Sequence, residues 1–133
     1  MNIPIKPLNQ YDIMKYIKKL KIPNFIGVYM KDTLPKNSSY ENECGIVSLD
    51  SIKNSGIHWT CWFKNNNLCY YFDSFGVEPP LEFEDYMQCD ILYSTYQIQK
   101  INEIICGHLC LTVLYGLAVL IKYKFPFYSF FSL

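Results

Sequence analysis

Hydrophobic residues near the N-terminus recur at the spacing of an amphipathic helix. Ile13, Ile17 and Leu20 follow one another at intervals of four and three residues, and lysines occupy the opposite side. Asn9 followed by Asp12 has the composition of a capping box, which places the start of the helix next to Asn9. The pattern predicts a short helix that ends before the next proline.

Shorter hydrophobic runs separated by polar turns predict strands. Apolar residues dominate 25–30 and 44–49, and a third run, 57–63, alternates with polar positions. Three asparagines at 65–67 join that run to a further one at 68–72. The loop length and composition predict that these last two runs form an antiparallel hairpin.

The second half of the chain predicts two helices around a brief strand. Residues 81–88 fit a short helix with a proline in its first turn, and 91–94 fit a strand. From Cys106 to about Lys122 the chain is apolar on all sides, which predicts a long helix buried against the sheet. We therefore expect an α+β fold, with a small mixed or antiparallel sheet packed on a central buried helix.

Length and composition fit one globular domain over residues 1–133. Half of the residues are hydrophobic, 17% are aromatic and only 18% are charged, which excludes a disordered chain. We expect the core of the domain over about residues 8–122, followed by an aromatic tail, 123–133. The pattern assigns no role to this tail, and contact with a membrane or a partner is a minority hypothesis for it. The long helix contains His108 and is at the short limit for a membrane span, so a membrane is not the expected partner.

Charge and cysteine content narrow the function classes further. Twelve lysines balance twelve acidic residues and arginine is absent, so the bidentate side chains that favour nucleic-acid recognition are missing. Six cysteines without a secretory signal favour a reducing, intracellular location over disulfides. With two histidines and no Cys-x-x-Cys pair, we expect no metal, and no cofactor is assigned.

Cys106 is the first candidate for chemistry, because it stands at the predicted start of the long helix. The positive end of the helix dipole stabilises a thiolate there, and Gly107 beside it leaves open space for a substrate backbone. The alternative is a buried free cysteine that only packs. This stretch by itself leaves the two interpretations even.

A thiol protease also needs a base and a group that orients the base. His108 lies two residues after Cys106, where side chains on a helix do not face each other, so His58 is the candidate base. Asp73 closes the second strand of the hairpin and can accept a hydrogen bond from His58. The alternative is that Asp73 only opens the turn that follows. This is the commoner role of an aspartate at such a position.

The oxyanion of such a reaction needs two donors. The backbone N–H of Cys106 is one, and the side-chain amide of Gln97 or Gln99 is the other. Trp59, beside the candidate base, is by itself more typical of a core aromatic than of a substrate contact.

Four motifs in this order resemble the adenovirus maturation protease family, adenain, and especially the versions carried by Maverick/Polinton transposons and related viruses. They are Gly56-Ile-His-Trp59, Cys69-Tyr-Tyr-Phe-Asp-Ser-Phe-Gly76, Ser94-Thr-Tyr-Gln-Ile-Gln99 and Cys106-Gly-His-Leu-Cys110. The resemblance covers most of the chain, to about residue 115.

The resemblance implies a papain-type cysteine protease fold and a role for each candidate residue. His58 is implied as general base, Asp73 as its orienting acid and Cys106 as nucleophile. The family's seven-residue step from glutamine to cysteine selects Gln99 as the oxyanion donor. Trp59 becomes a motif residue that packs beside the base.

The resemblance also implies a function. It implies a maturation endopeptidase that cleaves Gly-containing sites in viral or transposon capsid precursors, through a narrow channel over Gly107, in the host cytoplasm or nucleus or inside virions. The chain ends 27 residues after Cys106, so we expect it to be short of the elements that hold the family's activating peptide. Dependence on a peptide or DNA activator is therefore not carried over, and Cys89 stays unassigned.

Two other functions remain open from the sequence. The wider clan of proteases that remove ubiquitin-like proteins shares the His-Trp, Asp and Gln-to-Cys-Gly order, so a deconjugating protease is one alternative. The short C-terminus and the aromatic tail motivate the other, an inactive, domesticated element that serves as a binding module.

Overall fold

The structure is a computed structural model that describes residues 2–50, 58–100 and 103–124. In chain order the elements are α1 (Gln10–Leu20), β1 (Phe25–Met30), β2 (Glu43–Ser48), β3 (Trp59–Asn65), β4 (Leu68–Phe72), α2 (Leu81–Met87), β5 (Asp90–Tyr93) and α3 (Cys106–Lys122). The strands form one sheet in the order β1-β2-β3-β4-β5. The predicted α+β fold with a mixed sheet is therefore confirmed.

The centre of the sheet is antiparallel and its two outer pairs are parallel. β2, β3 and β4 pair antiparallel, whereas β1 pairs parallel with β2 and β5 parallel with β4. The predicted hairpin is β3 and β4, and its turn residues Asn66 and Asn67 have φ angles of 49° and 65°. Two consecutive positive φ angles are what a tight turn between twisted strands requires, and asparagine tolerates them. Ile57, the first residue of the predicted run, lies outside the described residues.

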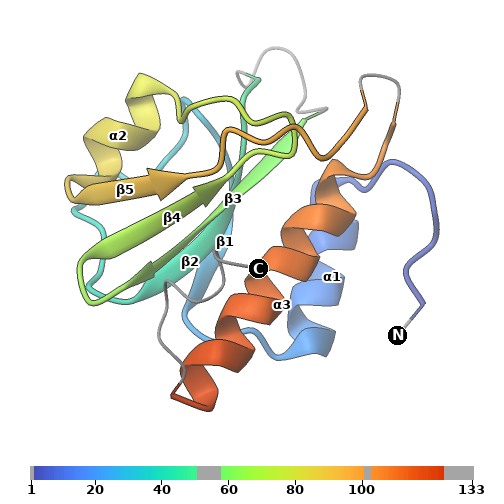
Figure 1. Ribbon diagram of the computed structural model, residues 1–133, viewed down its shortest axis with the longest axis horizontal. Helices are drawn as coiled ribbons and strands as arrows, with labels where there is room; N and C mark the ends of the chain where they lie inside the picture. The colour runs from blue at the N-terminus through green and yellow to red at the C-terminus, as the bar shows by residue number, and fades with distance from the viewer. Residues whose placement is uncertain (1, 51–57, 101–102, 125–133) are drawn as a thin grey trace.

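Helices cover both faces of the sheet (Figure 1). α1 and α3 pack on one face, in a core that includes Ile13, Ile46 and Leu114. α2 packs on the other face, where Trp62 and Phe83 are fully buried. Because β3 and β4 have a layer on each side, both are buried along nearly their whole length. The alternation at 57–63 therefore does not separate a buried face from a wet one.

Local sequence signals set the bounds of α1 as predicted. The Asn9 side chain accepts a hydrogen bond from the Asp12 N–H at 2.8 Å, and the Asp12 carboxylate accepts from the Asn9 N–H at 3.2 Å. The helix ends at Leu20, and Lys21 follows in a left-handed conformation before Pro23. α2 begins one residue after Pro80, which caps the helix instead of lying in its first turn.

α3 begins at Cys106 and ends at Lys122, as predicted, but its burial is one-sided. Cys110, Leu114 and Leu117 face the core, whereas Thr112 and Tyr115 are exposed. The helix is buried against the sheet, as predicted, while within the described residues the outer side of this largely apolar helix is only partly covered. No helix in the part of the chain that the structure describes is long and apolar enough to cross a membrane.

Candidate active site

Three element ends bring the candidate residues together. Antiparallel pairing of β3 and β4 puts the start of one strand beside the end of the other, so His58 and Asp73 meet. α3 packs across β3 with its N-terminus at the same end of the sheet, and there the backbone N–H of Trp59 donates to the Cys106 sulfur at 3.4 Å. Residues far apart in the sequence thus form one cluster.

His58 and Asp73 form a close pair at this end of the hairpin. The His58 Nε2 and the Asp73 Oδ1 are 2.8 Å apart, and the Asp73 side chain is completely buried while the His58 side chain is 18% exposed. The same Oδ1 accepts a hydrogen bond from the Phe75 N–H at 2.8 Å. The two roles weighed for Asp73, partner of His58 and organiser of the turn, are therefore both filled.

The imidazole of His58 is held in an electrostatic environment that favours its charged form. Burial lowers the pKa of His58, but hydrogen bonds to Asp73 and Cys106, with the charges of both groups, raise it to about 9. Since Nε2 is taken up by Asp73, the remaining ring nitrogen, Nδ1, is the one available to the thiol. The ring of Phe75 stacks on the imidazole with the centroids 4.6 Å apart, which helps to fix its plane.

Cys106 is set apart from the other thiols by its pKa. Burial raises the pKa of Cys106, but hydrogen bonds from His58, from the Trp59 N–H and from the Gly107 N–H outweigh burial and lower it. No side chain caps the N-terminus of α3, so the positive end of the helix dipole adds to the same effect. By contrast, burial raises the pKa of four other thiols, those of Cys44, Cys69, Cys89 and Cys110.

Gln99 and Gln97, which sequence reasoning alone did not separate, lie in different environments. Gln99 is buried, its Oε1 accepts from the Ser74 hydroxyl and its Nε2 donates to the Glu103 carbonyl. Gln97 is exposed and donates to the Gln99 carbonyl. A side-chain amide carries two N–H donors, so the bond to Glu103 leaves Gln99 one more. The hydrogen bonds described for Gln99 fix its loop next to the start of α3 and do not include Cys106.

Gly107 does not border open space, so the expected room for a substrate at this position is a wrong prediction. A Cβ at residue 107 would lie 3.2 Å from the Leu8 side chain and 3.4 Å from that of Trp59. The glycine instead allows the N-terminal segment to pack closely on α3. The Trp59 indole N–H donates to the Leu8 carbonyl at 2.7 Å, and the ring of His108 bonds the Pro4 carbonyl at 2.7 Å. His108 therefore points away from the cluster, as its spacing from Cys106 predicted.

Leu8, Ser74 and Gly76 were missed from the sequence. Leu8 precedes the helix cap Asn9, which is the position of a hydrophobic staple, and this signal identifies it as a packing residue. Ser74 holds Gln99, and its carbonyl accepts from the Gln99 backbone N–H at 2.9 Å. Gly76 has a φ of 73°, and a Cβ there would lie 2.5 Å from the Thr95 carbonyl oxygen. Because residue 76 has no side chain, the loop that carries Gln99 packs directly on the turn after Asp73.

Comparison with known proteins gives the fold a precedent. Neither a protein-family model nor a curated protein matches the sequence. A selenomethionine crystal structure of the ASFV pS273R protease matches with a TM-score of 0.61 over 86% of this chain, at 12% identity. A second crystal structure of the same protease matches with a TM-score of 0.53 over 86% of the chain, also at 12% identity. This chain spans 59% and 57% of those two chains, and at such identity the likeness shows a shared fold.

Within the described residues, no three His, Cys, Asp or Glu side chains converge as a set of metal ligands. The narrower resemblance to adenain and the Maverick/Polinton proteases stays a prediction.

Proposed function

We propose that this protein is a cysteine endopeptidase in which Cys106 is the nucleophile, His58 the general base and Asp73 the group that orients the base. One observation carries the proposal. The contacts from Asp73 through His58 reach the thiol whose pKa is lowered, while four other thiols have raised pKa values. Nucleophilic catalysis requires a thiol whose pKa is lowered, so that the thiolate is available at neutral pH.

In the proposed reaction, His58 and Cys106 form an imidazolium–thiolate pair. The thiolate attacks the scissile carbonyl, and the Cys106 N–H with the second Nε2 hydrogen of Gln99 stabilises the oxyanion. His58 then gives its proton to the leaving amine as the C–N bond breaks, which leaves an acyl-enzyme. A water molecule, deprotonated by His58, then attacks the thioester; the C–S bond breaks, the acyl group leaves as a carboxylic acid, and the imidazolium–thiolate pair is restored.

The proposed substrate is a polypeptide with Gly-containing cleavage sites, in a viral or transposon capsid precursor. The motif resemblance to adenain and the fold shared with the ASFV pS273R protease support this class of substrate. We place the activity inside the cell, since the six cysteines of the chain are free and a thiolate nucleophile is best preserved in a reducing compartment.

The decisive experiment compares Cys106→Ala with Cys69→Ala on Gly-containing precursor peptides. Cys69 is buried on the far face of the sheet, so its replacement controls for the loss of a buried thiol. We expect Cys106→Ala to abolish cleavage and Cys69→Ala to retain it. Equal cleavage by the Cys106→Ala protein would refute the assignment. A ubiquitin-like probe ending in two glycines, tested in parallel, would reassign the substrate class if it labels Cys106 while the peptides remain intact.

A further inference from the structure

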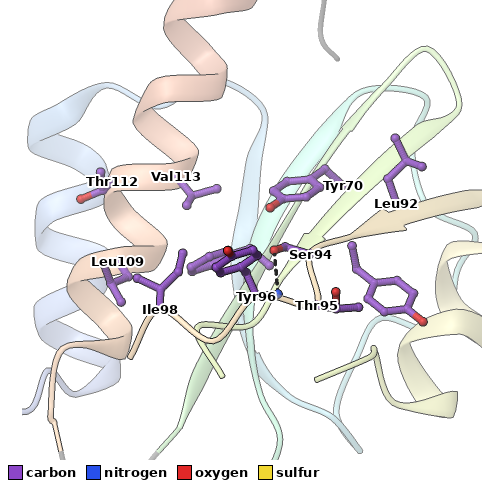
Figure 2. A pocket seen from close by; sticks show the side chains of 11 residues that line it. Tyr70, Leu92, Ser94, Thr95, Tyr96, Ile98, Leu109, Thr112 and Val113 are labelled. Carbon is purple, nitrogen blue, oxygen red and sulfur yellow. Dashed lines mark hydrogen bonds between the residues drawn. The ribbon is translucent and has the colours of Figure 1, made fainter. Parts of the chain in front are cut away.

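An apolar groove lies between one flank of α3 and the edge strand β5, and Figure 2 shows the side chains that line it. Its volume is about 860 Å³. Leu109 and Val113 form the α3 wall, Tyr70 lies between the walls on β4, and Tyr96 and Ile98 project from the loop after β5. None of the lining residues is charged.

The groove leaves large apolar side chains in water. Tyr96 is 79% exposed, Ile98 55% and Leu92 44%, and all three line the same groove. A contiguous apolar surface of this kind marks a place that another segment or molecule covers. Another groove, beside α1, has Lys15, Lys18 and Lys21 among its lining residues, so it offers an apolar segment a poorer site.

We propose that residues 125–133 of this chain, Phe-Pro-Phe-Tyr-Ser-Phe-Phe-Ser-Leu, bind in the groove beside α3. This segment contains five aromatic residues among its nine and no charged residue, and all charged residues of the chain precede it. An uncharged aromatic segment gains free energy by leaving water for an uncharged apolar groove. Covalent attachment raises its effective concentration at the groove to about the millimolar range. The proposal goes beyond the protease function and does not depend on it.

The conformation at the end of α3 is compatible with a tail that returns to the groove. Lys124 has a φ of 60°, and its N–H donates to the Ile121 carbonyl at 3.1 Å. A left-handed residue after the last turn ends a helix and redirects the chain that follows. A segment that follows such a residue is free to turn away from the axis of α3.

The segment is also long enough. At about 1.5 Å of rise per helical residue, Val113 lies about 14 Å and Leu109 about 20 Å back along α3 from Lys122. Nine extended residues span about 30 Å. A tail that turns back along α3 thus reaches the α3 wall of the groove as far as Leu109.

Photo-crosslinking in the full chain tests the proposal. Phe131→p-benzoylphenylalanine, at a position that an extended tail carries about 23 Å beyond Lys124, is irradiated in dilute solution, and the crosslinked residues are identified by mass spectrometry. We expect intramolecular crosslinks to groove residues such as Ile98 and Leu109. The same photoreactive residue at Tyr11, which is 80% exposed on α1, serves as the control and should not label the groove.

Two charge substitutions sharpen the test. Ile98→Asp and Thr112→Glu alter exposed positions on opposite walls, so circular dichroism should show an unchanged fold. Each should lower the crosslinking yield at least about fivefold, because the seated tail would bury an unpaired carboxylate. Tyr40→Asp, at an exposed position away from the groove, should leave the yield unchanged. The proposal is overturned by crosslinks that map elsewhere, by crosslinks between two copies, by none at all, or by a yield that ignores both substitutions.

Discussion

Two carboxylates, Glu43 and Asp73, are buried equally deeply in this protein, each with 1% of its surface exposed. Glu43 begins β2 and accepts hydrogen bonds from the Tyr40 N–H, the Trp62 indole N–H and the Tyr86 hydroxyl. Asp73 follows β4 at the opposite end of the hairpin, and its partners include the imidazole of His58. The depth of burial is the same, but the chemistry of the partners differs.

In the proposed function, this difference separates a structural acid, Glu43, from a functional one, Asp73. The donors to Glu43 keep their protons near neutral pH, since burial and the bond to Glu43 raise the pKa of Tyr86 well above its usual value. The partner of Asp73 titrates, with a pKa of about 9, and it leads on to a thiol. Burial is therefore common to both acids, and the proposed role of Asp73 rests on the chain of titratable groups that leads from it to the thiol.

Removing His58 tests the comparison most severely. His58→Ala should lower kcat/KM by about 10²–10⁴-fold, the usual contribution of a general base, and the thermal midpoint should also fall, because the completely buried Asp73 carboxylate loses its charged partner. Peptide hydrolysis and a melting curve provide the two measurements. Near-normal turnover in this variant would show that the Asp73 cluster is as structural as the Glu43 cluster.

Removing Glu43 should affect stability alone. Glu43→Ala leaves two buried donors, the Trp62 indole and the Tyr86 hydroxyl, and the part-buried Tyr40 N–H without their acceptor, which should lower the free energy of unfolding by about 3 kcal/mol. The kcat per folded molecule should stay unchanged, as determined by active-site titration of the refolded fraction after urea unfolding. A specific loss of kcat would mean that Glu43 also acts on the reaction.

Asp73→Asn separates charge from geometry. Asparagine keeps an oxygen for the Phe75 N–H and His58, and a His-Asn pair supports cysteine proteases of the papain type, so kcat/KM should fall only about tenfold. Loss of the negative charge removes one cause of the raised His58 pKa. The imidazolium should then deprotonate earlier, and the alkaline limb of the pH–rate profile should move below its wild-type position near pH 9. Glu43→Gln is the matched control, and an unmoved limb in Asp73→Asn would contradict the assignment.

The smallest expected effect concerns two serines, one beside each carboxylate cluster. Ser74 donates to Gln99, whereas Ser39 accepts from Lys64 and donates to the Met87 carbonyl. Ser74→Ala should lower kcat about threefold with KM unchanged, because a less firmly held Gln99 stabilises the oxyanion less well. Ser39→Ala should alter only stability, by about 1 kcal/mol. Equal kcat values in the two variants would remove Gln99 from the proposed site.

The sequence by itself determined the local elements and the candidate residues. Helix period and the Asn9 cap defined α1, the Asn-rich turn defined the hairpin, and the change from polar to apolar residues placed the start of α3 at Cys106. These signals are predictable because each depends on backbone geometry within a few residues. His58 and Asp73 followed from the same hairpin, since pairing of its strands brings their ends together.

Only the tertiary structure decided how those residues are supported. It brought Leu8 onto Gly107, where open space was expected, joined Ser74 to Gln99, gave Asp73 both of its roles and left the outer side of α3 only partly covered. Each of these features depends on contacts between segments that are distant in the sequence. Such contacts follow from the packing of side chains in three dimensions, and no period or turn signal along one stretch encodes them.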